Sequence, residues 1–395
     1  MNEKCLGLGN NRSIIRELFE FSKEQKRILG EDKVYDFSLG NPSVPPHKKL
    51  NEELINLIQT KPDTFLHGYT SAQGDNAVRE KIANNLNKRF NTNYEYTDIY
   101  MTCGAAASLC ITFKAITEKS TDEILAIAPY FTEYKVFVES AGATFKLVPA
   151  DLNEFQINFN ELEKILNPNV KAIIINSPNN PTGVIYSKAS LTKLSNLLKE
   201  KEKEYNHPIY IIADEPYREI AYDNIEVPHI PNLYDNTIIC YSYSKSLSLP
   251  GDRIGYILIP KKAYQSKDLY LACLGAGRAL GYVCAPSLFQ HVIELCVDYT
   301  SDMDEYKKNR DLLYNGLTKI GYECVYPQGA FYLFVKALED NAYNFMEKAK
   351  KYNLIVVPSD NFGVTGYVRL AYCVSSSTII NSMDSFEKLY KEYKK

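Results

Sequence analysis

The chain has 395 residues, of which 45% are hydrophobic and 24% are charged, and its formal net charge is −3. A chain of this length and apolar content can bury a large core, which excludes a mainly disordered protein and predicts one large or two smaller domains. The 45 basic and 48 acidic residues nearly balance, so we expect neither nucleic acid nor an anionic membrane as a partner.

The residue pattern argues against two further kinds of protein. No apolar run approaches the ~20 residues that span a bilayer, and the first residues lack the basic and apolar segments of a signal peptide. We therefore expect a soluble, cytoplasmic protein. The nine cysteines include no C-x-x-C pair and the five histidines show no metal-binding spacing, so we expect no metal site and no disulfide framework.

The predicted elements begin with a helix over residues 14–29. Through the middle of the chain, apolar β-branched runs alternate with amphipathic stretches, a pattern typical of a mostly parallel sheet with both faces covered. The expected strands are Ile99–Thr102, Glu123–Ala128, Thr144–Val148, Val170–Asn176, Pro208–Asp214, Thr237–Tyr243 and Ile254–Ile259. Helices are expected between them at 105–117, 131–140, 159–166 and 190–205. The predicted fold class is α/β with a seven-stranded sheet.

After about residue 286 the pattern changes to longer helices and shorter strands. We expect helices at 287–319, at 342–352 and from residue 378, and strands at 331–335, 354–358 and 367–372. This pattern is typical of a smaller α+β domain. The predicted division is a large domain over residues 46–285 and a small domain made of residues 1–45 and 286–395.

Four polar segments are predicted at strand ends, where open α/β sheets gather their ligands. Thr102–Ser108 follows a strand and opens a helix, and its small residues let backbone N–H groups approach an anion, although packing alone more often explains them. Asn176–Gly183 contains two prolines and three asparagines and specifies a rigid turn. Asp214 ends a very apolar strand, where a carboxylate is costly unless it meets a cation or hydrogen-bond donors, so it is either a structural cap or a ligand.

The fourth segment, Tyr241–Gly255, places Lys245 between two serines at the end of a buried strand, with Arg253 further along. A lone lysine is usually a surface residue, but one that leaves a buried strand is not placed like a solubilising side chain. In a desolvated site, or near another cation, the pKa of its amine would fall, and the neutral amine could form a Schiff base.

Together the four segments meet the needs of one cofactor, pyridoxal phosphate (PLP). PLP requires a lysine for its aldehyde, donors for its phosphate, and a carboxylate that keeps its pyridine nitrogen protonated so that the ring stabilises a carbanion at the substrate Cα. The series S-P-N-N-P-T-G, D-E-x-Y and S-x-S-K followed by G-x-R-x-G resembles the class I aminotransferases of PLP fold type I, the aspartate aminotransferase group. The resemblance runs from about residue 36 to the C-terminus.

The resemblance implies a role for each matching residue. Lys245 would form the Schiff base and then move the proton at the substrate Cα, while Asp214 would hold the pyridine nitrogen. Asn180 and Tyr217 would donate to the ring oxygen of the cofactor. The phosphate would be held by Gly104, Ala105, Ala106, Ser242, Ser244 and Arg253.

Other matching residues concern the cofactor ring, the substrate and a second subunit. Tyr130 would stack on the ring, and its alternative interpretation is an ordinary core aromatic residue. Arg369 would bind the substrate α-carboxylate through its planar fork, and Gly40 and Asn180 would lie against the same substrate. Tyr69 matches a tyrosine that reaches the phosphate of the neighbouring subunit, which implies a homodimer with shared active sites.

The expected substrates are acidic, because aminotransferases of this group must accept glutamate or 2-oxoglutarate and a second carboxylate needs a cation or donors. One subgroup uses a lysine where this chain has Ala106. Another uses an arginine of the partner chain a few residues before Asn-Pro. Arg278 lies near that place, but it is offset and the segment lacks the asparagine, so a surface arginine is the alternative interpretation.

Three functions fit these residues. The leading interpretation is an aminotransferase that exchanges an amino group between an amino acid and a 2-oxo acid by a ping-pong mechanism. A PLP-dependent β-lyase or decarboxylase on the same fold is the second. The third is a regulatory domain that binds PLP without turnover, but such proteins carry a DNA-binding module and none is visible before residue 36. The set of Lys245, Asp214 and Arg369 favours the aminotransferase.

Overall fold

The computed structural model describes residues 1–10 and 13–394 of the chain. These residues form two compact units, and each unit is described by itself. The smaller unit comprises Met1–Ser43, Pro181–Val184 and the chain from Asp304 onward, and the larger unit comprises Val44–Asn180 and Ile185–Met303.

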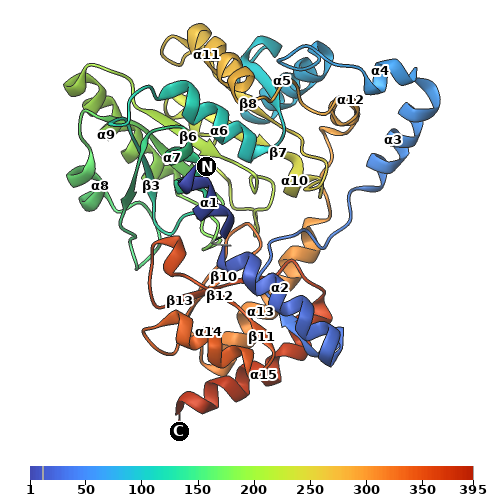
Figure 1. Ribbon diagram of the computed structural model, residues 1–395, viewed down its shortest axis with the longest axis vertical. Helices are drawn as coiled ribbons and strands as arrows, with labels where there is room; N and C mark the ends of the chain where they lie inside the picture. The colour runs from blue at the N-terminus through green and yellow to red at the C-terminus, as the bar shows by residue number, and fades with distance from the viewer. Residues whose placement is uncertain (11–12, 395) are drawn as a thin grey trace. The chain divides into compact units, whose positions relative to one another are not determined.

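The larger unit is built on a seven-stranded sheet, of which β3, β6, β7 and β8 are labelled in Figure 1. Its strand order is β2-β8-β7-β6-β5-β3-β4. β8 runs antiparallel to both of its neighbours and the other six strands run parallel to one another. The strands are β2 (Ile99–Thr102), β3 (Glu123–Ile127), β4 (Thr144–Val148), β5 (Val170–Asn176), β6 (Tyr210–Asp214), β7 (Thr237–Ser242) and β8 (Gly255–Leu258). The predicted α/β fold with a mostly parallel seven-stranded sheet is confirmed.

Both faces of this sheet are buried, which explains why its central strands are apolar at every position rather than at alternate ones. In β5, Ala172 and Ile174 belong to one core cluster while Ile173 and Ile175 belong to the other. One cluster is covered by α6 (Ala105–Ile116), α7 (Glu133–Ser140) and α11 (Ser266–Ala279). The other is covered by α3 (Lys48–Thr60), α4 (Asp63–His67), α5 (Asn76–Phe90), α8 (Phe159–Ile165), α9 (Lys188–Tyr205) and α12 (Ser287–Cys296).

The single helix expected over residues 287–319 is wrong, because the chain forms two helices there. α12 ends at Cys296 and α13 (Met303–Ile320) begins after a short irregular segment. Within that segment, the Ser301 backbone N–H donates to the Ser246 carbonyl at 2.8 Å, and the Ser301 and Ser248 hydroxyls are 2.9 Å apart. In a continuous helix the Ser301 N–H would donate to the carbonyl four residues earlier, so its hydrogen bond to Ser246 is incompatible with one helix through this segment.

The smaller unit contains a four-stranded antiparallel sheet and a two-stranded parallel one. The first has the order β12-β13-β10-β9 and the second pairs β1 with β11. Its strands are β1 (Tyr35–Asp36), β9 (Cys324–Val325), β10 (Tyr332–Lys336), β11 (Leu354–Ile355), β12 (Val357–Pro358) and β13 (Tyr367–Ala371). Its helices are α1 (Glu3–Asn10), α2 (Ile14–Leu29), α13, α14 (Ala342–Lys350) and α15 (Ser376–Lys394).

The strand expected over residues 354–358 is divided between these two sheets. Leu354 and Ile355 pair with Tyr35 and Asp36, whereas Val357 and Pro358 pair with Arg369 and Val368. The pairing with β1 joins parts of the chain that lie far apart in sequence, and a local pattern does not reveal such a partner.

The predicted domain boundaries stay a prediction, and the two units differ from them at residues 44–45, 181–184 and 286–303. Residues 286–303, which we expected in the small domain, lie with the larger unit. Val292, Ile293 and Cys296 of α12 are buried in the core cluster that α3 and α5 also line. Among the described residues, no helix has both the length and the hydropathy needed to cross a bilayer.

Candidate active site

The polar residues that follow the central strands meet at one edge of the seven-stranded sheet. Asn176, Asp214 and Ser242 are the last residues of the neighbouring strands β5, β6 and β7. Asn176 is in register with Asp214, and Ser242 is in register with Gly255 at the start of β8. Because β8 runs in the opposite direction, its first residue lies at the same edge as Thr102, the last residue of β2.

Asp214 is a buried carboxylate with one satisfied and one unsatisfied oxygen. The Tyr134 hydroxyl donates a short hydrogen bond to Oδ2, and the Asn176 side-chain amide lies 3.5 Å from the same oxygen. Oδ1 is also buried, but it has no hydrogen-bond partner among the described residues. A buried acceptor without a partner costs free energy unless a ligand supplies the donor.

The environment of Asp214 raises its pKa from 3.8 to about 7. Burial is the main cause, because it penalises the charged form of the carboxyl group. The hydrogen bond from Tyr134 acts in the opposite direction, and the nearby Glu215 raises the pKa further. A cation brought to Oδ1 would restore the charged form of this group.

A cradle for an anion is formed by Gly104, Ser242, Ser244 and Arg253. Gly104 precedes the first turn of α6 with a positive φ of 88°, and a Cβ placed there would lie 3.0 Å from an Arg253 guanidinium nitrogen and 3.6 Å from Ser242 Oγ. The Ser242 and Ser244 hydroxyls are 2.6 Å apart. Ala105 and Ala106 form the first turn of α6, where backbone N–H groups have no partner within the helix.

Arg253 is held in place by backbone carbonyls. Its guanidinium donates to the carbonyl of Pro250 at 2.8 Å and to that of Cys103 at 3.2 Å. Gly255 permits this close approach of the two loops, since a Cβ there would lie only 2.2 Å from the Tyr241 carbonyl and 3.0 Å from Gly104 Cα. A positive charge, two hydroxyls and a helix start therefore converge on one point.

Lys245 lies between these two features along the edge of the sheet. It is on the short helix α10 (Tyr243–Ser246), directly after β7, and its side chain is partly buried. Asp214 ends the adjacent strand, and the serines of the cradle flank the lysine in sequence. The structure thus gathers an amine, a carboxylate and an anion cradle at neighbouring strand ends.

Asn180 and Tyr217 come from the loops that follow β5 and β6. Both are buried, and the Asn180 backbone N–H donates to the Asn176 side chain at 2.8 Å. Tyr217 lies near enough to Tyr134 to contribute, after burial and Asp214, to raising the pKa of that tyrosine.

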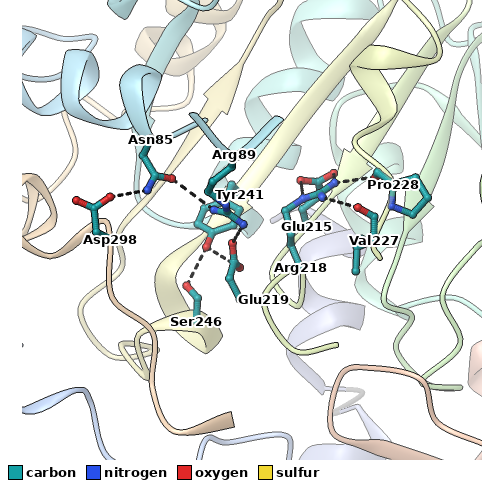
Figure 2. A network of polar contacts seen from close by, with 10 residues as sticks. All are labelled: Asn85, Arg89, Glu215, Arg218, Glu219, Val227, Pro228, Tyr241, Ser246 and Asp298. Carbon is teal, nitrogen blue, oxygen red and sulfur yellow. Dashed lines mark hydrogen bonds and ion pairs between the residues drawn. The ribbon is translucent and has the colours of Figure 1, made fainter. Parts of the chain in front are cut away.

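A network of polar contacts supports the loop that follows β6 from within the larger unit (Figure 2). Arg218 forms a paired, fully buried contact with Glu215, and it donates to the carbonyls of Val227 and Pro228 at 3.2 and 3.1 Å. This contact neutralises the carboxylate next to Asp214 in the sequence, although it leaves some effect on the pKa of Asp214.

The second part of the network in Figure 2 reaches the helix that carries Lys245. Arg89 pairs with Glu219 at 2.8 Å, and the Tyr241 hydroxyl donates to the same carboxylate at 2.8 Å. That hydroxyl is also 2.9 Å from Ser246 Oγ, the residue after Lys245. The end of α10 is therefore fixed from the side of α5.

Two of the predicted substrate residues lie together in the smaller unit. Arg369 on β13 is 2% exposed, and its guanidinium donates to the Ser38 carbonyl and lies over the rings of Tyr332 and Phe362. Gly40 lies two residues after Ser38. A Cβ at this position would lie 2.0 Å from the Tyr332 hydroxyl oxygen. Glycine is required there because the tyrosine leaves no room for a side chain.

The remaining three predicted site residues lie elsewhere in the larger unit. The Tyr130 ring is partly buried against Phe145 at a centroid distance of 5.1 Å. Tyr69 is 90% exposed, in the segment between α4 and α5. Arg278 is exposed in the last turn of α11, and its side chain makes no ion pair or hydrogen bond with the described residues.

Comparisons with known proteins agree on one family. A model of the aminotransferase class I and II family matches residues 32–386. An aspartate aminotransferase of Thermotoga maritima is 27% identical over 380 residues, which is 94% of this chain and 96% of that protein. The crystal structure of an aminotransferase from Eubacterium rectale is 55% identical, with a TM-score of 0.99 over 100% of this chain and 99% of that one. The chain belongs to the class I and II aminotransferases.

The substrates named for these relatives differ. Beside the aspartate aminotransferase, aromatic-amino-acid aminotransferase 2 of Thermococcus litoralis is 28% identical over 403 residues, covering 97% of each protein. Membership of the aminotransferase family therefore gives the reaction, whereas the substrate side chain has to be inferred from residues of this chain.

Aminotransferases of this family depend on PLP, and the residues present fit that cofactor. The unpartnered Asp214 Oδ1 suits a protonated ring nitrogen, which is both a donor and a cation. The cradle around Gly104 and Arg253 suits a phosphate, and the Lys245 amine suits an aldehyde. These three needs are met at adjacent strand ends.

The sequence reasoning missed residues that act on Asp214 rather than on a ligand. Tyr134 and Asn176 orient the carboxylate, and Arg218 pairs with Glu215 beside it. Tyr134 could have been noticed, since a tyrosine in line with Val138 on one face of an amphipathic helix is predicted to be buried and then needs a partner for its hydroxyl. No local pattern says that this partner is Asp214.

The raised pKa of Asp214 predicts a pH dependence of stability in protein prepared without PLP. A raised carboxyl pKa favours the protonated form in the folded state, so this stabilisation is complete below about pH 4 and is lost as the pH rises through about 7. Relative to Asp214→Asn, the free energy of unfolding of the wild type should fall over this range by up to roughly 4 kcal/mol, because one pKa unit is about 1.4 kcal/mol.

Urea unfolding from pH 4.5 to 8 measures this difference. Asp235→Asn, which removes an exposed carboxylate of the same unit, is the control and should follow the wild type. Parallel profiles for the wild type and Asp214→Asn would show that the carboxyl group titrates normally.

Proposed function

We propose that this aminotransferase exchanges an amino group between an acidic amino acid and a 2-oxo acid in a site centred on Lys245. The observation that carries the proposal is the buried, unpartnered Asp214 Oδ1 on the strand next to the lysine. A buried carboxylate oxygen without a hydrogen-bond partner costs free energy unless a ligand supplies a donor. A protonated pyridine nitrogen is such a donor.

We further propose that each predicted site residue has one task. Gly104, Ala105, Ala106, Ser242, Ser244 and Arg253 hold the phosphate, while Asn180 and Tyr217 donate to the ring oxygen. When bound, PLP supplies an aldehyde for the amino nitrogen and a ring that delocalises the negative charge formed at Cα. Asp214 keeps a proton on the ring nitrogen, which strengthens this effect.

The amine of Lys245 takes the proton from the substrate Cα and returns one during the exchange. Arg369 binds the α-carboxylate, and Gly40 and Asn180 lie against the same substrate. The buried guanidinium of Arg369 supports this role, because a fork with fixed orientation suits a planar carboxylate. Tyr130 remains the proposed ring-stacking residue, although its contact in the structure is with Phe145.

Covalent attachment of PLP should occur at Lys245. Borohydride reduction of the loaded enzyme followed by peptide mapping should place the pyridoxyl label on this residue. Lys245→Ala should lose the label and at least 1000-fold of the transamination rate, about 4 kcal/mol in the barrier. Lys262→Ala, which removes an exposed lysine of the same unit, should keep both. A label on another residue contradicts the assignment, and ammonia release without an added 2-oxo acid would favour a β-lyase.

The proposed acidic preference depends on Arg278, which is exposed and without an ion pair among the described residues. A charged contact to a second carboxylate is worth about 1.5–3 kcal/mol, so Arg278→Leu should lower kcat/KM for aspartate or glutamate by roughly ten- to a hundred-fold. Values for alanine and phenylalanine should change little. Lys267→Leu removes another exposed cation of α11 and should affect no substrate selectively. An equal loss for all substrates would remove Arg278 from the site.

We propose that the enzyme is a homodimer in which each subunit completes the other's site. Tyr69 is 90% exposed, so in a single chain its hydroxyl reaches no ligand. Exposed apolar side chains of the same unit could be covered by a second copy; they are Ile55, Ile58, Phe65, Leu271, Leu280 and Val283. A cytoplasmic location is proposed as well, because all nine cysteines are free thiols, as in a reducing compartment.

Mixed dimers test the sharing of sites. Tyr69→Phe and Lys245→Ala chains, each strongly impaired alone, should together regain about a quarter of wild-type activity, since half of the random dimers carry one complete site. Mixing Tyr264→Phe, another exposed tyrosine, with Lys245→Ala should give only the activity of the intact Tyr264→Phe sites. A fully active monomer at assay concentration would contradict the shared site.

A further inference from the structure

We propose that Tyr134 is a positioning residue whose hydroxyl fixes the Asp214 carboxylate with Oδ1 toward the cofactor nitrogen. This inference rests on the proposed role of Asp214. It adds a residue that touches neither cofactor nor substrate, and it explains why only one of the two carboxylate oxygens is left without a partner.

Tyr134 is buried, so its hydroxyl cannot donate to bulk water instead of to Asp214. The residue lies in the first turn of α7, it is 1% exposed, and its ring packs edge-on against Phe131 at a centroid distance of 5.5 Å. Its ring also belongs to the core cluster beneath the sheet. A rigid, buried tyrosine thus presents one donor to one acceptor.

The two oxygens of Asp214 are made unequal by their surroundings. Tyr134 donates to Oδ2, and the Asn176 amide lies 3.5 Å from that oxygen while donating to the Asp214 carbonyl at 2.9 Å. Without such a contact the χ2 torsion angle of an aspartate has a broad distribution, so the carboxylate would adopt many orientations. The hydrogen bond therefore selects one orientation of the carboxylate, in which Oδ1 is the oxygen left without a partner.

Tyr134 also opposes the effects that neutralise Asp214. Burial and Glu215 both raise the pKa of the carboxyl group, and the hydrogen bond from Tyr134 lowers it. Tyr217, Cys240 and Lys245 also lie near Asp214, and burial together with the negative charge of Asp214 raises the pKa of the Cys240 thiol. Glu215 forms an ion pair with Arg218. Removing the Tyr134 hydroxyl should thus raise the pKa of Asp214 further.

The test is the pH dependence of PLP affinity in Tyr134→Phe, followed by the absorbance of the bound cofactor between pH 5 and 9. A hydrogen bond to a charged group predicts roughly a ten-fold weaker affinity at neutral pH. The pH below which affinity falls should be higher in Tyr134→Phe than in the wild type. The value of kcat should fall by a similar factor while KM changes little, because the substrate does not contact Tyr134.

A matched control separates this role from a general loss of a buried hydrogen bond. Tyr234 is 2% exposed, lies in the same unit and donates to the Glu202 carboxylate at 2.7 Å. Tyr234→Phe should lower the Tm without moving the pH profile of PLP affinity. Tyr134→His, which keeps an N–H donor on a ring, should lie closer to the wild-type profile than Tyr134→Phe does, and it tests the same point if Tyr134→Phe folds poorly.

A double-mutant cycle with Asp214→Asn completes the experiment. The Tyr134→Phe change should have little further effect on PLP affinity once Asp214 is asparagine. Additive effects, or a wild-type pH profile in Tyr134→Phe, would overturn the inference while leaving the role of Asp214 intact. Failure of the wild type to bind PLP, or unchanged affinity in Asp214→Asn, would instead overturn the proposed function.

Discussion

The placement of a carboxylate at the buried end of β6 is the constraint on which the site depends. Asp214 is 5% exposed, and its charge is costly at that position. The surrounding residues reduce this cost only in part: one oxygen receives a hydrogen bond, and the neighbouring Glu215 is neutralised by Arg218. Asp214 Oδ1 still lacks a hydrogen-bond donor, and a positively charged donor would suit it best. The same edge of the sheet also presents the Lys245 amine and the anion cradle, which could contact other groups of the same ligand.

The sheet itself explains why such a carboxylate can be held so firmly. Its central strands are buried on both faces, and alternate side chains of β5 enter two different core clusters. Strand ends in this setting have little freedom, so Asn176, Asp214 and Ser242 keep their spacing. Residues that must meet a rigid ligand are placed on rigid elements, and loops such as the one bearing Arg253 are tied to them by backbone hydrogen bonds.

Most of the large sheet could be predicted from the sequence because its strands are continuous apolar runs bounded by turn residues. The helices α3, α4, α5 and α11 were not predicted, although Leu50, Leu54 and Leu57 of α3 recur at helical spacing. The break between α12 and α13 depends on hydrogen bonds from Ser301 to Ser246 and Ser248, and the division of residues 354–358 depends on a distant strand. Local patterns carry no information about such long-range partners.

The site shows the same division between local and distant information. Lys245, Asp214, Asn180 and Arg253 lie in motifs that the sequence displays, and the structure gathers Asp214, Lys245 and Arg253 at one sheet edge. Tyr134 lies outside those motifs, and its proposed role depends on a hydrogen bond to Asp214, which is 80 positions away along the chain. Residues that touch a ligand tend to form short patterns around strand ends, whereas residues that hold them in place can come from anywhere in the core.

The antiparallel strand β8 has a consequence for the order in which the protein is made. β2 joins the sheet only through β8, which lies between β2 and β7 and is the last of the seven strands to leave the ribosome. Gly104 follows β2, whereas Ser242 and Arg253 flank the turn into β8. A nascent chain that ends between α10 and β8 therefore has the lysine but no assembled anion cradle. The anion cradle is complete only after this final insertion, and β13 with Arg369 is made later still, so the residues proposed for the cofactor are assembled before those proposed for the substrate.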